Sequence, residues 1–458
     1  MAAPDDDARE DFDTVRARDP QAAIGEQGHP RILTAHGGVY ENEKLESLLA
    51  VITGRLIEQT DEPNRAYTIT VLNSPSVNAF ALPGGYLYVT RGLLALANDS
   101  SELAAVLAHE MAHVSSNHGI RRSQQARAAD LATQVASDVV SSPLVGKVAQ
   151  ATTRQRLASF SQQQELQADA VGIRHVGKTG YDPFGAVRFL VAMERYSAWR
   201  SSFSAPDDDM ASSHPSTPRR IELARRHARI AASPGTGETA RDRLLEGIDG
   251  LTFGETAREG FVRGSSFSHV QLGITFSVLD DFELTNRSDA VIGTGPDEQA
   301  LRFDAVPAPD AASGPADYIA SGWVNGLDPD SVQTGRVRGL PMATAQAEAG
   351  DWGFSIAVIT AGDTHYRFIM AAPRSVAGSD QRLAAVTETF RQLSASERAS
   401  LKPLRLRVVT VGQGDTVESL SRRMSDLRRP VALFRALNGL DAGDTIRPGS
   451  RVKIVSAQ

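Results

Sequence analysis

Apolar residues recur at helical spacing along the first half of the chain. They predict an amphipathic helix around Glu43–Glu58 and a second, more apolar helix that starts after Asp99. Asp99 and Glu102 have the spacing of a capping box at that start, and Gly119 is a candidate stop. Between the two helices, alternating apolar residues predict strands around Tyr67–Leu72 and Tyr86–Thr90. The pattern therefore indicates a mainly helical region with a small sheet.

The second half of the chain has a different pattern. Short apolar runs at 273–278, 352–360 and 366–371 predict strands, and residues 383–393 predict a helix. These elements indicate a small α+β domain over about residues 250–400. We find no catalytic constellation in it, and its function stays unassigned.

The last stretch changes pattern again. A helix is predicted from Val417 to Met424, a second from Val431, and a closing strand follows Pro448-Gly449. This βααβ pattern resembles a LysM module. The resemblance implies binding of glycans that contain N-acetylglucosamine, such as peptidoglycan. The alternative is a structural cap without a glycan groove, because a fold alone does not fix a function.

The predicted fold class is therefore α+β, in four parts. An N-terminal arm (1–40) precedes a mainly helical domain with a small, edge-exposed sheet (41–235). The α+β domain (250–400) and the LysM-like module (404–458) follow.

The composition of the chain narrows the choice of protein class and of cellular compartment. The 458 residues carry a net charge of −7, which gives no reason to expect a nucleic-acid partner. No apolar run reaches the roughly 18 residues that a transmembrane helix needs. Without cysteine, neither a disulfide nor a thiolate metal ligand is available. The acidic start of the chain lacks the regions of a secretory signal, so the sequence predicts either a cytosolic protein or one whose signal is absent from this chain.

The stretch His109-Glu110-Met111-Ala112-His113 places two histidines four residues apart on a helix. At that spacing both imidazoles lie on one face and can converge on one metal ion. Glu110 follows the first histidine and can take a proton from water at such a site. Chance produces such matches too, so other features must support this one. His109 and His113 are our candidate zinc ligands, and Glu110 is the candidate catalytic base.

A zinc site of this type needs a third protein ligand. The metzincin extension HExxHxxGxxH is not present, because Ser116 replaces the glycine and Gly119 replaces the third histidine. In the Ala-rich helical stretch Glu165-Leu166-Gln167-Ala168-Asp169, the two acids share a face. Glu165 is the candidate third ligand, and Asp169 is expected to orient a ligand imidazole. A solvated acidic helix face is the alternative.

Together, HEMAH and ELQAD resemble the gluzincin metallopeptidases of the HtpX and CAAX-prenyl-protease type (peptidase family forty-eight), especially their soluble, periplasmic BepA-like branch. The resemblance covers about residues 20–235. Three flanking segments contribute to it: Val77–Gly85, Gly180–Pro183, and Ser213–Thr217 followed by Arg220 and Ile221. It implies a zinc metalloendopeptidase with one zinc ion per chain.

The resemblance also implies roles for residues outside the zinc helix. Asn78, Ala79, Phe80 and Ala81 would form an exposed edge strand to which a substrate backbone adds; from the residues alone, an ordinary buried strand is equally possible. His214 lies in a Ser-, Pro- and Asp-rich segment, Ser201 through Pro218, that predicts a long loop. In the family, the matching histidine lies near the metal, where it stabilises the oxyanion or occupies the open coordination position. A surface histidine is the alternative.

The predicted function is hydrolysis of extended or misfolded polypeptides in protein quality control. The soluble relatives imply a periplasmic or cell-envelope location and envelope assembly machinery as a partner, with a cytoplasmic location as the alternative. Two other functions stay open: a non-catalytic, zinc-stabilised chaperone or scaffold, and a hydrolase of peptidoglycan stem peptides. An intact Glu110 argues against the scaffold, because a structural zinc site needs no base.

Overall fold

The computed structural model describes residues 12–120, 162–201, 214, 216–287, 290–308, 314–424 and 427–457. Most of the helical stretch expected between the zinc-binding helices, and most of the loop expected from Ser201 to Pro218, lie outside these residues. The first half of the chain contains the following elements: α1 (Phe12–Ala17), α2 (Ala22–Ala35), α3 (Glu43–Ile57), β1 (Thr68–Leu72), β2 (Ala79–Leu82), β3 (Tyr86–Thr90), α4 (Arg91–Leu96), α5 (Ser100–Ser115), a helix described over 162–178, α8 (Gly185–Ser201), α10 (Pro218–Ala231) and α11 (Arg241–Ile248).

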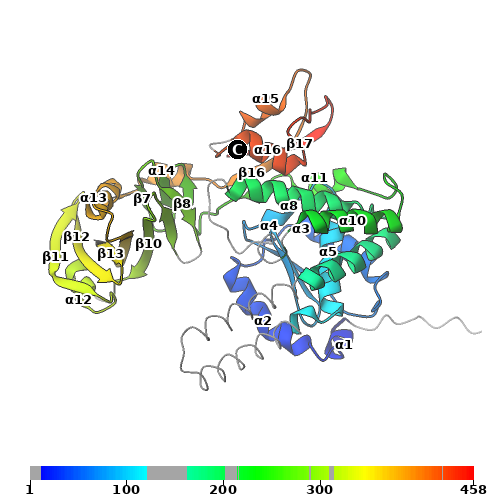
Figure 1. The fold of residues 1–458 in the computed structure, drawn as a ribbon, viewed down its shortest axis with the longest axis horizontal. Coiled ribbons are helices and arrows are strands. Elements are labelled where there is room, and N and C mark those ends of the chain that lie inside the picture. The colour runs from blue at the N-terminus through cyan, green and yellow to red at the C-terminus, as the bar shows by residue number, and fades with distance from the viewer. Residues whose placement is uncertain are drawn as a thin grey trace, which may run out of the picture.

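A three-stranded sheet lies between helices in this first half (Figure 1). Its order is β1-β3-β2, with β1 parallel and β2 antiparallel to β3, so β2 is an edge strand. Alternate residues of β3 point to opposite faces. Tyr86 and Tyr88 pack against α2, whereas Leu87 and Val89 join the main core with α3 and α5. The arm thus covers one face of the sheet, and the metal-binding helix covers the other.

The start of α5 follows from its sequence. The side chain of Asp99 accepts a hydrogen bond from Glu102 N at 3.0 Å, as the capping pattern predicts. The Glu102 carboxylate, however, accepts from Asn98 N at 2.9 Å, one residue before the expected partner. The helix ends at Ser115, and Asn117 adopts the left-handed conformation with φ 53°. The expected stop at Gly119 was therefore wrong. Asparagine also tolerates the left-handed conformation, so Asn117 can end the helix before the glycine is reached.

The region over 250–400 is richer in strands than its sequence pattern predicted. A seven-stranded sheet has the order β11-β12-β13-β14-β10-β9-β8, and a four-stranded sheet has the order β15-β7-β6-β5. The helix predicted over 383–393 begins and ends four residues earlier, because Gly378 starts it and Phe390 leaves helical geometry. The elements are β5 (Phe261–Arg263), β6 (Ser266–His269), β7 (Ile274–Ser277), β8 (Glu283–Asn286), β9 (Val291–Thr294), β10 (Ala300–Pro307), α12 (Pro315–Ala320), β11 (Leu327–Val337), β12 (Leu340–Ala349), β13 (Trp352–Ala361), β14 (Thr364–Pro373), α13 (Ser379–Thr389), β15 (Arg391–Gln392) and α14 (Ala395–Ser400).

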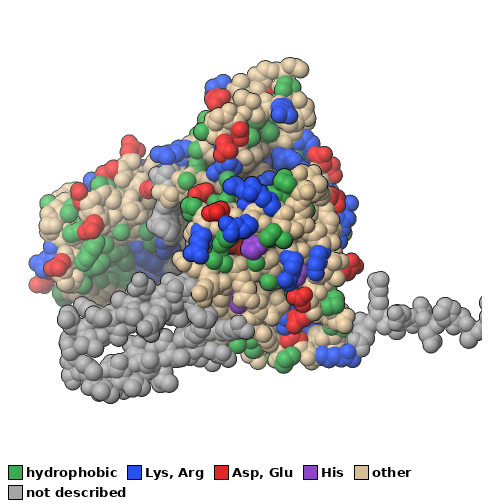
Figure 2. Space-filling view, turned by 45° about the vertical axis from the view of Figure 1, so that its right-hand side comes forward, with side chains coloured by type: hydrophobic (Ala, Val, Ile, Leu, Met, Phe, Trp, Pro, Cys, Tyr) green, Lys and Arg blue, Asp and Glu red, His purple; other side chains and the backbone are tan. Residues whose placement is uncertain are grey.

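The C-terminal module has the expected βααβ order but gains a third strand. Strand β4, at the start of the region over 250–400, pairs with β16 and gives the sheet order β17-β16-β4. Its apolar residues belong to the same core as α3 and α5, and α16 packs on α8 and α4. Figure 2 shows the module continuing the surface of the helical half, with Lys and Arg side chains gathered below it. The elements are β4 (Thr252–Phe253), β16 (Leu404–Thr410), α15 (Val417–Ser421), α16 (Pro430–Asn438) and β17 (Arg451–Ser456).

One buried lysine joins the module to the helical half. Lys453 of β17 is 0% exposed, and its ammonium donates to the carbonyls of Ala95, Leu96 and Ala97 at 2.7–3.0 Å. These carbonyls end α4, where the helix dipole favours a cation. The module is therefore anchored immediately before the start of α5. None of the described helices is long and apolar enough to cross a membrane.

Candidate metal centre and catalytic cleft

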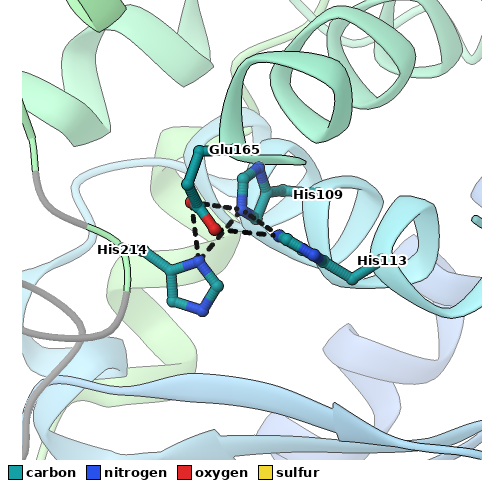
Figure 3. Close-up of side chains that lie close together, drawn as sticks. All are labelled: His109, His113, Glu165 and His214. Carbon is teal, nitrogen blue, oxygen red and sulfur yellow. Dashed lines mark hydrogen bonds and ion pairs between the residues drawn. The ribbon is translucent and has the colours of Figure 1, made fainter. Parts of the chain in front are cut away.

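Four side chains from three parts of the chain converge on one point. His109 and His113 come from α5, Glu165 from the helix over 162–178, and His214 from the segment before α10 (Figure 3). One potential ligand atom of each lies within 4.8 Å of the others. The two helices can approach closely because residue 172 is glycine: a Cβ there would lie 2.9 Å from His109 N.

The three ligands expected from the sequence lie close enough together to share one metal ion. His109 Nε2 lies 3.0 Å from His113 Nε2 and 3.3 Å from Glu165 Oε2, and His113 Nε2 lies 3.4 Å from Glu165 Oε1. Ligands about 2.0–2.1 Å from a tetrahedral zinc ion are separated by about 3.3–3.4 Å. Glu165 Oε1 is buried and makes no hydrogen bond among the described residues. A cation bound between these atoms would satisfy it.

The electrostatics of the cluster favour a bound cation. Burial lowers the pKa of His109, but the carboxylates of Asp169 and Glu165 outweigh burial and raise that pKa to about 10. Burial lowers the pKa of His113 to about 3, so its imidazole is neutral and can donate a lone pair. Burial raises the pKa of Glu165, but the three surrounding histidines hold it far below its usual range. The site therefore favours one positive charge among neutral and anionic ligands, and a metal ion can supply that charge.

Asp169 supports the first ligand. Its Oδ1 lies 3.0 Å from His109 Nδ1, which favours the tautomer with a proton on Nδ1 and leaves Nε2 facing the other ligands. Burial raises the pKa of Asp169, but Arg220 and His109 lower it to about 2, so the carboxylate is charged.

Arg220 belongs to a flanking segment of the family resemblance, and its contacts to Asp169 and Glu165 were not predicted from the sequence. It donates two hydrogen bonds to Asp169, one to the carbonyl of His214 at 3.0 Å, and its Nη1 lies 3.2 Å from Glu165 Oε2. The sequence signal for the burial of Arg220 was helical spacing, because Arg220, Ala224 and Ala228 form the buried face of α10. An arginine in line with two small apolar residues predicts a buried guanidinium.

His118 follows the end of α5. The structure buries it, 1% exposed, with its Nδ1 2.9 Å from His113 Nδ1. Its Nε2 lies 3.3 Å from Gln167 Oε1. It thus orients the second metal-binding histidine as Asp169 orients the first.

Glu110 faces a cleft rather than the metal ligands. The cleft has a volume of about 140 Å³ and is lined by β2 residues, by Glu110 and His113, and by His214. Glu110 is 3% exposed, and its Oε1 makes no hydrogen bond within the described chain. Burial raises its pKa, and His214 opposes that shift. A buried carboxylate with a raised pKa beside a metal site suits proton transfer at neutral pH.

His214 lies at the open side of the cluster. Its Nδ1 is 2.8 Å from Glu165 Oε2 and 3.3 Å from His109 Nε2, while its Nε2 is 3.9 Å from Glu110 Oε1. It is 7% exposed, so it is not a surface histidine. It therefore belongs to the same cluster of potential ligand atoms as His109, His113 and Glu165.

The predicted substrate strand is the free edge of the sheet. Ala79, Phe80 and Ala81 belong to β2, and Asn78 directly precedes it. Thr90 N donates to Asn78 O at 3.0 Å, so the alternation of an antiparallel ladder turns the peptide groups of Ala79 and Ala81 outward. Phe80 and Ala81 also line the cleft. An extended chain could therefore pair with this edge beside Glu110.

Two buried histidines and a glutamate around one point, with a second glutamate in a cleft beside an edge strand, define a metallopeptidase-type domain. Family models agree: residues 42–228 match peptidase family M48, and residues 409–455 match the LysM domain. The chain therefore contains an M48 peptidase domain and a LysM domain, and the resemblance seen in the sequence is confirmed. The α+β fold class is confirmed as well.

Curated relatives have protease names. The beta-barrel assembly-enhancing protease of Escherichia coli (strain K12) is 30% identical over 183 residues, covering 38% of this chain and 37% of the relative. The mitochondrial metalloendopeptidase OMA1 of Schizosaccharomyces pombe is 27% identical over 214 residues, covering 46% of this chain and 59% of the relative. The chain thus matches well under two thirds of either relative. A crystal structure from Bacteroides thetaiotaomicron VPI-5482 covers 43% of this chain and 88% of its own, at 12% identity and a TM-score of 0.26, which supports no inference.

Proposed function

We propose that this protein is a zinc-dependent endopeptidase that cleaves extended or misfolded polypeptides. The observation that carries the proposal is Glu110, a buried carboxylate in the cleft beside the ligand cluster, whose Oε1 makes no hydrogen bond among the described residues. A purely structural metal site has no use for such a group. His109, His113 and Glu165 would hold the zinc ion, and Asp169, His118 and Arg220 would keep the ligands in place.

Zinc bound there would polarise the scissile carbonyl and lower the pKa of a water molecule to about 7. Glu110 accepts the proton from the attacking water and passes it to the leaving amine. The edge of β2 positions the substrate, because the outward peptide groups of Ala79 and Ala81 can hydrogen-bond an extended backbone. An extended substrate is required for this pairing, which favours unfolded segments over folded surfaces.

His214 has two candidate roles. At its observed position, with Nδ1 2.8 Å from Glu165 Oε2, it would keep water away from a zinc ion held by the other three residues and so would keep the free enzyme inactive. If the segment that carries it moves when substrate binds, its imidazole can instead donate to the developing oxyanion. We favour the inhibitory role in the free enzyme, because both His109 and Glu165 lie within 3.3 Å of its Nδ1.

The LysM domain supports a periplasmic or cell-envelope location, with peptidoglycan or another glycan as a binding partner. The name of the Escherichia coli relative, a protease that enhances beta-barrel assembly, supports a role in such assembly, and we infer the envelope assembly machinery as a further partner. The same LysM domain favours one other activity, hydrolysis of peptidoglycan stem peptides. The scaffold hypothesis has less support, since it leaves Glu110 without a role.

Digestion of casein and of purified sacculi by the full chain separates these functions. We expect zinc-dependent cleavage of casein, which a chelator abolishes and added zinc restores, and no release of stem peptides. Release of stem peptides with intact casein would favour the wall hydrolase. No cleavage of either substrate by the zinc-loaded protein would favour the scaffold.

A further inference from the structure

The N-terminal arm forms one end of the catalytic cleft, although it lies outside the residues that match the peptidase family model. Gln21, directly before α2, lines the cleft together with Leu82, Pro83 and Glu110. The family match begins only at residue 42. The N-terminal segment therefore contributes a wall to the cleft from outside the residues that match the family model.

A single hydrogen bond joins this wall to the metal-binding helix. Gln21 Nε2 donates to Asn117 Oδ1 at 2.6 Å, across 96 residues of sequence. Asn117 follows the end of α5 and also lines the cleft. The bond thus connects the beginning of α2 to the end of α5, beyond the two metal-binding histidines.

The wall is fixed against the end of β2. A Cβ at Gly25 would lie 2.2 Å from the carbonyl oxygen of Pro83, and one at Gly84 would lie 2.7 Å from Ala22 Cα. Only glycine permits backbones to approach this closely. Further along α2, His29 Nδ1 lies 2.7 Å from the hydroxyl of Tyr88 in β3. The arm is therefore packed onto the sheet at the point where the substrate edge ends.

We propose that the Gln21–Asn117 bridge is the end wall of the substrate cleft and limits how far a substrate extends beyond Leu82. This inference rests on the proposed peptidase function. A chain that pairs with β2 from Ala79 towards Leu82 meets the start of α2 and the bridge after β2 ends. A substrate that is long on this side must break the bridge, whereas one that is long on the other side does not meet the bridge. Gln21 and Asn117 thus determine length specificity on one side of the scissile bond.

The test uses quenched fluorescent peptides that share one cleavable core and carry one to four added residues on either side. For the full-length enzyme, we expect kcat/KM to fall when the core is extended on one side only. Gln21→Ala should restore cleavage of those extended peptides by about 2- to 10-fold, because the net contribution of one hydrogen bond is about 0.5–1.5 kcal/mol. Asn117→Gly should have the same effect, since glycine keeps the left-handed backbone at φ 53° and removes the acceptor. The double variant should gain no more than either single variant.

Gln27→Ala is the matched control, because Gln27 is an exposed glutamine on the same helix. Binding of the same peptides to the Glu110→Gln variant provides a readout that does not require turnover. Equal length dependence in wild type and in both bridge variants would overturn the proposal. If the Glu110→Gln variant binds the peptides in a length-dependent way but the wild type cleaves none of them, the wall would be supported and the peptidase function would be contradicted.

Discussion

Arg220 holds the carboxylate of Asp169 through two hydrogen bonds, from Nε at 2.7 Å and from Nη2 at 2.8 Å. The same carboxylate lies 3.0 Å from His109 Nδ1. A planar guanidinium that contacts both carboxylate oxygens fixes the rotation of Asp169, and Asp169 in turn fixes the imidazole. The geometry of the metal centre therefore depends on α10 as well as on the two helices that carry the ligands.

Replacement of Arg220 by alanine is expected to weaken zinc binding by about 10- to 100-fold, the usual cost of losing a partner that orients a metal ligand. Competition with a chromogenic chelator measures the zinc affinity directly. Arg219→Ala is the control, because Arg219 is the exposed neighbour on the same helix. Equal zinc affinity in the two variants would remove Arg220 from the supporting network.

Replacement of His214 by alanine distinguishes inhibition from assistance. If the imidazole blocks the fourth ligand position, the variant should cleave a short peptide faster than wild type does. If it stabilises the oxyanion, turnover should instead fall by about 10²–10³-fold. We expect the increase. Unchanged activity would argue against both roles.

The LysM domain is expected to stabilise the peptidase domain, because the two share one core. Lys453→Met removes the ammonium that binds three carbonyls at the end of α4 and leaves them buried without a donor. Each such loss costs about 1–3 kcal/mol. Thermal unfolding should therefore begin at a lower temperature than in Lys402→Met, which changes an exposed lysine. A chain truncated after about Leu404 should be less stable still, and equal midpoints for all proteins would contradict this coupling.

Glu255 should contribute a loss of stability as pH rises from acidic to neutral values. Burial raises the pKa of Glu255 from 4.5 to about 7 and outweighs the hydrogen bond that its carboxylate accepts from Val262 N. A raised folded-state pKa gives a contribution that is complete below 4.5 and is lost as pH rises through about 7. Glu255→Gln should reduce the difference between thermal midpoints at about pH 5 and about pH 8. The same change at exposed Glu26 should not, and an undiminished difference in Glu255→Gln would rule out this group.

The local patterns in the sequence predicted the helix that carries HEMAH and the pairing of Glu165 with Asp169, because both depend only on helical periodicity. Other features depend on packing between distant segments. Lys453 alternates with apolar neighbours in β17, a pattern that predicts a solvent-facing side chain, but the end of α4 covers it. The third strand of the LysM sheet comes from β4, about 150 residues upstream, and strand patterns do not specify such partners. Gln21 is likewise an unremarkable polar residue until α2 is packed against β2.

Substitution of Glu110 by glutamine tests the central claim most directly, with zinc content and casein cleavage measured on the same preparation. The proposed mechanism predicts that the variant retains about one zinc ion per chain, because Glu110 is not a ligand, and loses cleavage, because an amide cannot accept the proton. Cleavage at the wild-type rate by the zinc-loaded variant would show that Glu110 is not the base and would contradict the mechanism.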